Sequence, residues 1–305
     1  MQEPVLSKFN VYQSVTSKII EAIENGPGEV RMPWHVPGIA AFPTNAVTHG
    51  EYRGVNVLSL WIDAQLRGYP SQLWASYRQW KQIGAQVRKG EKGSLVVFYK
   101  RIETSVHEEE DHERDGKLRF VARASWVFNV AQVDGFVPPP DTQRPSEFER
   151  LREVEAFVDA IDAKVEHGHP MARYRRDIDT IEMPSAEWFV GTPTSSPQEA
   201  FHGVLLHETV HWVGAEHRLN RTFGKRFGDA NYAMEEMVAE IGAAFLCAAF
   251  GISNEPRPDH AAYIANWLKV LKNDPKAIFT AASQAQEAFE HLAYLATRND
   301  KGAEA

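Results

Sequence analysis

The chain has 305 residues, of which 43% are apolar and 24% are charged, which is ordinary for a globular protein and enough for two domains with a core each. Its single cysteine excludes an intrachain disulfide, its longest uncharged apolar run (241–252) is too short to cross a bilayer, and it opens with no apolar signal sequence. We therefore expect a cytoplasmic protein that has no membrane partner.

The net charge of −8 conceals a basic region. Between Arg31 and Arg101 there are ten lysines and arginines but only three acids, which leaves a local balance of +7. A basic region within an acidic chain indicates a polyanionic partner for that part of the chain.

The first domain, residues 1–137, has the pattern of a small α+β unit. Apolar residues recur at helical spacing in three stretches, and β-branched, apolar runs predict two strands after them. The predicted helices cover 9–24, 54–67 and 72–83, and the predicted strands cover 94–100 and 120–136. We expect the acidic residues 101–117 to form a hairpin tip and the Pro-rich residues 138–147 to form a linker.

Aromatic and basic residues are interleaved in this first domain. Aromatic rings stack on unpaired bases of any identity and lysine or arginine follows the phosphates, so the mixture suits a single strand better than a duplex. Some rings, Trp61 and Trp80 in particular, are expected in the core instead. The residues predicted to contact nucleic acid are Trp34, Tyr52, Arg53, Asn56, Trp74, Tyr77, Lys81, Arg88, Lys89 and Lys92.

The second domain, residues 148–305, is predicted to mix helices with short strands. A helix over 148–167 carries an apolar stripe, formed by Val154, Phe157, Val158 and Ile161. Residues 172–184 and 186–191 predict short strands, and an edge strand there would bind an extended peptide by backbone pairing. Two more helices are predicted within 259–297.

The segment 195–220 has the start signals of a helix. Ser196 is a good N-cap, Pro197 suits the first helical position, and Glu199 closes a capping box. Apolar residues then recur as far as Val213, so we expect a well-defined helix packed into a core.

This helix carries the motif HETVH. His207 and His211 lie about one turn apart, so their rings point to the same side and are near enough to share a divalent ion. Glu208 lies beside that face, where a carboxylate can take a proton from a metal-activated water. The motif is the signature of a zincin, and we expect Zn²⁺ with Mn²⁺ or Co²⁺ as alternatives.

A third histidine is one candidate for the remaining ligand. HETVHWVGAEH also fits a longer pattern in which Gly214 turns the chain and His217 completes a three-histidine site. Against it, His217 is followed by the polar residues 218–231, which are typical of a surface loop.

A second helix, predicted over 234–250, offers glutamates instead. Glu236 and Glu240 lie one turn apart beside small residues that allow close approach to the first helix. In some zincins one glutamate binds the metal and a later acid orients a ligand histidine. We predict Glu236 as the ligand, because two acids in an apolar helix are hard to explain structurally, and Glu235 or Glu240 stay as alternatives.

Long motifs in both domains resemble the ArdC-type antirestriction proteins, which plasmids carry into new hosts. In the first domain the resemblance rests on FPTNAVTHGEYRGVNVLSLW, GYPSQLWASYRQWKQIGAQVRKGEKGSLVVFY and WVFNVAQVDG. In the second it rests on DIDTIEMP, LLHETVHWVGAEHRLNR and EEMVAEIGAAFLCA. Several motifs in one order are far more specific than HETVH alone.

The resemblance implies an α+β protein in which the first domain binds single-stranded DNA and the second has a zincin-like metallopeptidase fold. It implies protection of incoming plasmid DNA from restriction during conjugation. By position, the metal ligands would be His207, His211 and Glu236, with Glu208 as the catalytic base. His217 departs from the family pattern, and the identity of the protein substrate is not implied.

Two other hypotheses remain open. In the first, the protein coats single-stranded DNA, its metal is structural, and no proteolysis takes place. In the second, it is a regulatory or toxin-like protease that ignores DNA.

Overall fold

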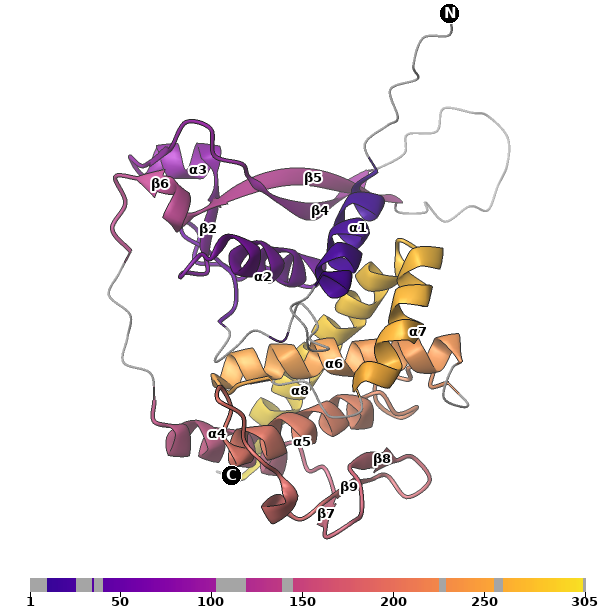
Figure 1. Cartoon of the computed structure of the whole chain (residues 1–305). Coiled ribbons are helices and arrows are strands. Elements are labelled where there is room, and N and C mark those ends of the chain that lie inside the picture. The colour runs from indigo at the N-terminus through magenta and orange to yellow at the C-terminus, as the bar shows by residue number, and fades with distance from the viewer. Residues whose placement is uncertain are drawn as a thin grey trace, which may run out of the picture.

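The computed structural model describes residues 10–25, 35, 41–102, 119–138, 145–224, 229–254 and 260–303. Helices and strands occur in both halves of the chain, so the fold is α+β as predicted (Figure 1). Three features named above lie wholly or mostly outside the described residues: Trp34, the acidic tip and the Pro-rich linker.

The N-terminal half is built on a four-stranded sheet of order β1-β2-β5-β4. β5 is antiparallel to both neighbours, and its register with β4 runs from Ser94↔Val127 to Ile102↔Arg119. A separate antiparallel pair joins β3 to β6. The elements are α1 (Val11–Glu24), β1 (Thr44–Asn45), α2 (Val55–Arg67), β2 (Leu73–Ser76), α3 (Tyr77–Gln82), β3 (Gln86–Val87), β4 (Ser94–Ile102), β5 (Arg119–Asn129), η1 (Val130–Gln132) and β6 (Val133–Asp134).

The helix predicted over 72–83 is wrong in its first half. Residues Leu73–Ser76 form β2 and pair with β5, and the helix begins only at Tyr77. Ser76 is the N-cap: its hydroxyl accepts from the Gln79 backbone, and the Gln79 side chain accepts from the Ser76 backbone. The cap inside the segment separates strand from helix.

The C-terminal half is mainly helical and has a small sheet of order β7-β9-β8. β9 is buried in the middle, parallel to β7 and antiparallel to β8, so β8 is an edge strand. The elements are α4 (Glu147–Ala160), β7 (Val165–His167), β8 (Arg173–Arg175), β9 (Thr180–Met183), η2 (Ala186–Trp188), α5 (Pro197–Val213), α6 (Ala230–Phe250), α7 (His260–Asn273) and α8 (Ala277–Ala303).

Two predictions in this half need correction. The helix predicted over 148–167 ends at Ala160, and its last three residues instead form β7 on the sheet. Residues 186–191 form no strand, and Ala186–Trp188 form a short 3₁₀ turn instead. The apolar stripe is confirmed, because Val154 and Val158 are buried in the core.

One hydrophobic cluster joins the two halves. It contains Ile19 of α1 and Trp61 of α2 together with Phe245 of α6, and the Trp61 and Phe245 rings lie 6.0 Å apart. In Figure 1, α6 crosses the middle of the molecule between α2 and α5. The helices α5 and α6 are therefore held by a core that the N-terminal half helps to build.

The contact between α5 and α6 depends on small residues. A Cβ at Gly242 would lie 2.9 Å from the methyl groups of Val210, so only glycine permits this approach. Cys247 is buried in the same core, as expected of a structural thiol. Among the described residues, no helix combines the length and the apolar character that a membrane span requires.

Candidate metal centre

The helix that carries HETVH begins as its sequence indicates. The Ser196 hydroxyl accepts from the Glu199 backbone at 3.0 Å, and the Glu199 carboxylate accepts from the Ser196 backbone at 3.1 Å. Pro197 occupies the first turn. The capping box fixes where α5 starts and hence which face its histidines present to α6.

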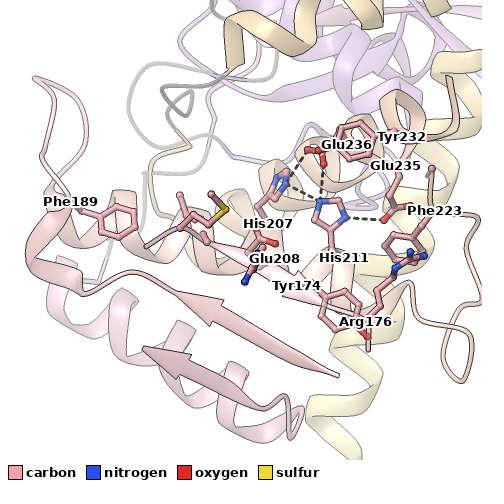
Figure 2. Close-up of a pocket in the computed structure, with 15 residues that line it drawn as sticks. Tyr174, Arg176, Phe189, His207, Glu208, His211, Phe223, Tyr232, Glu235 and Glu236 are labelled. Carbon is pink, nitrogen blue, oxygen red and sulfur yellow. Dashed lines mark hydrogen bonds and ion pairs between the residues drawn. The ribbon is translucent and has the colours of Figure 1, made fainter. Parts of the chain in front are cut away.

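Three donor side chains meet between α5 and α6 (Figure 2). His207, His211 and Glu236 are buried, and one ligand atom of each lies within 4.8 Å of the others. The two Nε2 atoms are 3.1 Å apart, and each lies 3.6 Å from an oxygen of Glu236. Among the described residues, this is the one cluster with the spacing of a metal site.

The far side of each imidazole faces a second carboxylate. His211 Nδ1 lies 3.0 Å from Glu235 Oε1, and His207 Nδ1 lies 3.3 Å from Glu240 Oε1. Because a carboxylate only accepts hydrogen bonds, His211 Nδ1 donates to Glu235, whereas the contact between His207 Nδ1 and Glu240 is an ion-pair distance and not a hydrogen bond. The two Nε2 atoms face each other and Glu236, an arrangement that suits a shared cation.

Glu235 is tied to a buried arginine. Arg221 donates to both Glu235 oxygens, at 2.7 and 3.0 Å, and also to the Val210 carbonyl at 2.6 Å. Burial alone raises the pKa of Glu235, but the hydrogen bonds from His211 and Arg221 outweigh it and hold that pKa below its ordinary value. The prediction of a surface loop over 218–231 is wrong at Arg221, which is only 8% exposed.

The three-histidine alternative does not assemble. The His217 side chain is 61% exposed and lies 3.4 Å from Asp179, away from the other histidines. Gly214 has an ordinary helical φ of −74°, so no turn requires glycine there. A Cβ at Gly214 would instead lie 2.6 Å from the Arg221 guanidinium, so this glycine makes room for the arginine.

A cavity of about 630 Å³ opens onto the three donors. Glu208, which is not one of the three donors, lines it together with Tyr232 from α6. Arg173 and Tyr174 of the edge strand β8 form another wall, and Figure 2 shows Tyr174 facing the site. Donors, a separate carboxylate and a sheet edge are thus gathered around one space.

A second cavity of about 390 Å³ adjoins the first. The two share Phe189, Val204 and His207. Its walls are mostly apolar, and small residues such as Gly203 and Ala243 keep it open. Ser253 also lines it, and the Ser253 hydroxyl has no hydrogen-bond partner within the described structure.

Comparison with known proteins gives matches over nearly the whole chain. A family described as the N-terminal domain of anti-restriction factor ArdC matches residues 9–128, and a family described as zincin-like metallopeptidase matches residues 152–284. The crystal structure of the antirestriction ArdC protein from plasmid R388, in its metal-free form, has a TM-score of 0.74 and 36% identity, covering 95% of this chain and 99% of that one. The chain belongs to the ArdC antirestriction family.

A second structure of the R388 protein and two further relatives add to this comparison. The Mn(II)-bound structure of the R388 protein matches with the same TM-score of 0.74, covering 94% of this chain and 98% of that one. Protein y4eC of Sinorhizobium fredii (strain NBRC 101917 / NGR234) is 46% identical over 91% of this chain and 90% of its own length. A DNA primase TraC of Escherichia coli is 31% identical over 90% of this chain, but the match spans only 26% of TraC. The likeness to TraC therefore says nothing of primase activity here.

Three of the residues predicted to contact nucleic acid have structural roles inside the N-terminal domain instead. Trp74 is 0% exposed and Tyr52 is 7% exposed, so neither ring can stack on a base, and the prediction is wrong for both. Both belong to a small core under the sheet. The Asn56 amide is occupied by the Val97 backbone, with one hydrogen bond of 2.9 Å and one of 2.7 Å, and so ties α2 to β4.

The other predicted contacts lie on the surface. Arg53 pairs with Glu290 of α8, and Arg88 pairs with Glu91 and Asp134. The remaining four, Tyr77, Lys81, Lys89 and Lys92, are exposed. Their role in binding stays a prediction.

An aromatic row, defined as Tyr77, Trp126 and Phe128, was only partly predicted from the sequence; Tyr77 shares α3 with Lys81. Trp126 is 49% and Tyr77 is 48% exposed, and the Tyr77 and Phe128 rings are 6.5 Å apart. A Cβ at Gly93 would lie 2.9 Å from Trp126 and 3.3 Å from Phe128, so the glycine after Lys92 sits directly against the row. The signal was the alternation of Trp126 and Phe128, which puts both on one face of a strand.

Proposed function

We propose that this ArdC family member protects incoming plasmid DNA during conjugation by coupling two activities. The N-terminal domain, residues 1–137, holds single-stranded DNA, and the C-terminal domain, residues 148–305, cleaves a protein bound there. The observation that carries the peptidase proposal is the single cavity that contains three metal donors, Glu208 and a sheet edge.

His207, His211 and Glu236 would hold the ion, and their nitrogen and carboxylate donors suit Zn²⁺. The Mn(II)-bound R388 relative supports a divalent metal, with Mn²⁺ and Co²⁺ as alternatives. When bound, the ion polarises a peptide carbonyl and acidifies water. Three protein donors would leave room on the ion for a water molecule and a peptide carbonyl, as a catalytic site requires.

Glu208 is the proposed general base. It takes a proton from the attacking water and delivers it to the leaving amine. An extended peptide would pair with the open edge of β8, which brings its backbone across the cavity. The second, apolar cavity would receive one of its side chains.

The aromatic row is the proposed platform for single-stranded DNA. The half-exposed rings of Tyr77 and Trp126 can stack on bases without regard to sequence, while Phe128 is more covered. The exposed Lys81, Lys89 and Lys92 supply charge for the phosphates. The balance of +7 between residues 31 and 101 is concentrated in this half of the protein.

A Glu208→Gln substitution tests whether peptidase chemistry is required. Because Glu208 is not a ligand, the variant should keep full metal content and DNA affinity but lose protection of a plasmid that enters a restricting host by conjugation. His211→Ala serves as the comparison that should lose the metal as well. Full protection by Glu208→Gln would refute the peptidase and favour a DNA-coating protein with a structural metal.

A second measurement tests the DNA half of the proposal. The full-length protein should retain an unpaired oligonucleotide at low salt, whatever residue stands at position 208. Failure to bind would favour the protease that ignores DNA.

A further inference from the structure

A histidine from the N-terminal half is buried next to the metal-site helices. His35 is 1% exposed, and its Nε2 donates to Glu240 Oε2 at 3.2 Å. The two residues are 205 positions apart in the chain. His35 precedes the N-terminal sheet in sequence, yet its hydrogen bond is to α6 of the metallopeptidase half.

Glu240 stands between this histidine and a proposed metal ligand. One of its oxygens faces His35, and the other lies 3.3 Å from His207 Nδ1. Glu240 is 3% exposed and is flanked on α6 by the buried, apolar Ala239 and Ile241. The chain of contacts runs from His35 through Glu240 to His207, whose opposite nitrogen points at the donor cluster.

The position of the buried Glu240 carboxylate depends on the hydrogen-bond donors around it. In a low-dielectric core an ionised carboxylate is costly unless hydrogen bonds satisfy it, so Glu240 depends on the hydrogen bond from His35 as well as on its close contact with His207. Carboxylates behind a ligand histidine fix its tautomer and ring orientation, and their loss weakens metal binding by roughly 10- to 100-fold. Whatever anchors Glu240 therefore also orients His207.

We propose that His35 is a positioning residue of the metal centre, which it acts on through Glu240. The N-terminal half thus contributes to the metal site as well as to DNA binding, and its packing and the metal affinity are thermodynamically linked. This inference rests on the proposed metal site. A wild-type protein that binds no divalent ion would refute that site, whereas the variants below test His35 alone.

Metal affinity measured on the full chain tests the proposal. Zn²⁺ and Mn²⁺ dissociation constants come from competition with a chelating indicator, and the visible absorption of bound Co²⁺ reports the ligand geometry. His35→Leu should weaken metal binding by roughly 10- to 100-fold and alter the Co²⁺ spectrum, while His35→Gln, which keeps an N–H donor, should recover much of the loss. His202→Leu, another buried histidine, is the matched control and should bind metal as the wild type does.

A double-mutant cycle distinguishes positioning from general destabilisation. Glu240→Gln keeps the side-chain shape and should weaken metal binding by itself, after which adding His35→Leu should cost little more. This cycle also remains informative if His35→Leu alone is too unstable to purify. Wild-type affinity in His35→Gln and Glu240→Gln alike, or an equal loss from His35→Leu with and without Glu240, would overturn the proposal.

Discussion

The metal centre and the proposed DNA face satisfy their charges in opposite ways. At the metal centre the side chains of Glu235 and Arg221 are 5% and 4% exposed, and each is hydrogen-bonded within the chain. On the DNA face Lys81, Lys89 and Lys92 point into solvent. The charges of the first region are satisfied within the fold, whereas the lysines of the second are left for solvent or, as proposed, for the phosphates of DNA.

The largest expected effect comes from removing a buried partner at the metal centre. Arg221→Ala would leave Glu235 as a buried carboxylate without the arginine that donates to both of its oxygens, which should cost about 3–5 kcal/mol of unfolding free energy. Because Glu235 also faces His211, metal binding should weaken by roughly 10- to 100-fold. Urea denaturation and metal titration measure the two effects.

Arg173→Ala is the matched control for this prediction. Arg173 also pairs with a glutamate, Glu182, but its side chain is 48% exposed. The Glu182 side chain is only 5% exposed, but it keeps Arg175 as a second donor, so the half-exposed Arg173 should contribute no more than about 1 kcal/mol. Equal losses from the two substitutions would mean that burial does not distinguish the metal centre from the surface.

The DNA face should respond to substitution in affinity and not in stability. Trp126→Ala should weaken oligonucleotide binding by about 1–3 kcal/mol, because one stacked base loses its platform. Lys89→Ala and Lys92→Ala should each lower the slope of log affinity against log salt by about 0.7. Fluorescence anisotropy at several salt concentrations measures both quantities.

Phe98→Ala controls for the loss of an exposed ring. Phe98 lies on the same pair of strands, β4 and β5, and is 51% exposed. It pairs with Arg123, whereas Trp126 pairs with Leu95. Because Phe98 and Leu95 are three residues apart on one strand, Phe98 and Trp126 lie on opposite faces of the sheet. The Phe98→Ala substitution should leave DNA affinity unchanged. An equal loss at Phe98 would move the proposed DNA site or extend it around the sheet.

The sequence predicts the residues of the metal centre better than those of the proposed DNA face, because local spacing determines the first and tertiary packing determines the second. His207, His211 and Glu236 were predicted because helical geometry converts spacing directly into direction. Arg221 was missed because its burial depends on tertiary contacts with Gly214 and Glu235, which no local pattern records.

The DNA face was harder to predict. Composition counts aromatic residues but does not say which are covered, so Trp74 was assigned to the surface and Trp126 was not. Strand β2 was read as helix because four residues are too few to show a period of two.

The smallest expected effect concerns Asp179, whose exposure lies between that of the buried metal centre and that of the exposed DNA face. Asp179 accepts from Arg218 and from the Tyr174 hydroxyl, and its side chain is 40% exposed. The hydrogen bond from Arg218, opposed by partial burial and assisted by Tyr174, lowers the pKa of Asp179 from 3.8 to about 2. A carboxyl whose pKa is depressed on folding stabilises the protein above its ordinary pKa, and that contribution is lost as the pH falls toward the folded value.

Asp179→Asn should therefore lower the unfolding free energy at pH 6 by about 1 kcal/mol, a figure reduced for solvent screening of a partly exposed pair. The gap between variant and wild type should narrow as the pH falls from about 4 toward about 2, because the wild-type carboxyl is then protonated as well. Urea denaturation at pH 6, 4 and 3 measures it. A difference in unfolding free energy that stays constant across this pH range would mean that Asp179 acts through its shape and not through its charge. The Asp179–Arg218 pair would then not be the partly screened ion pair that its exposure indicates.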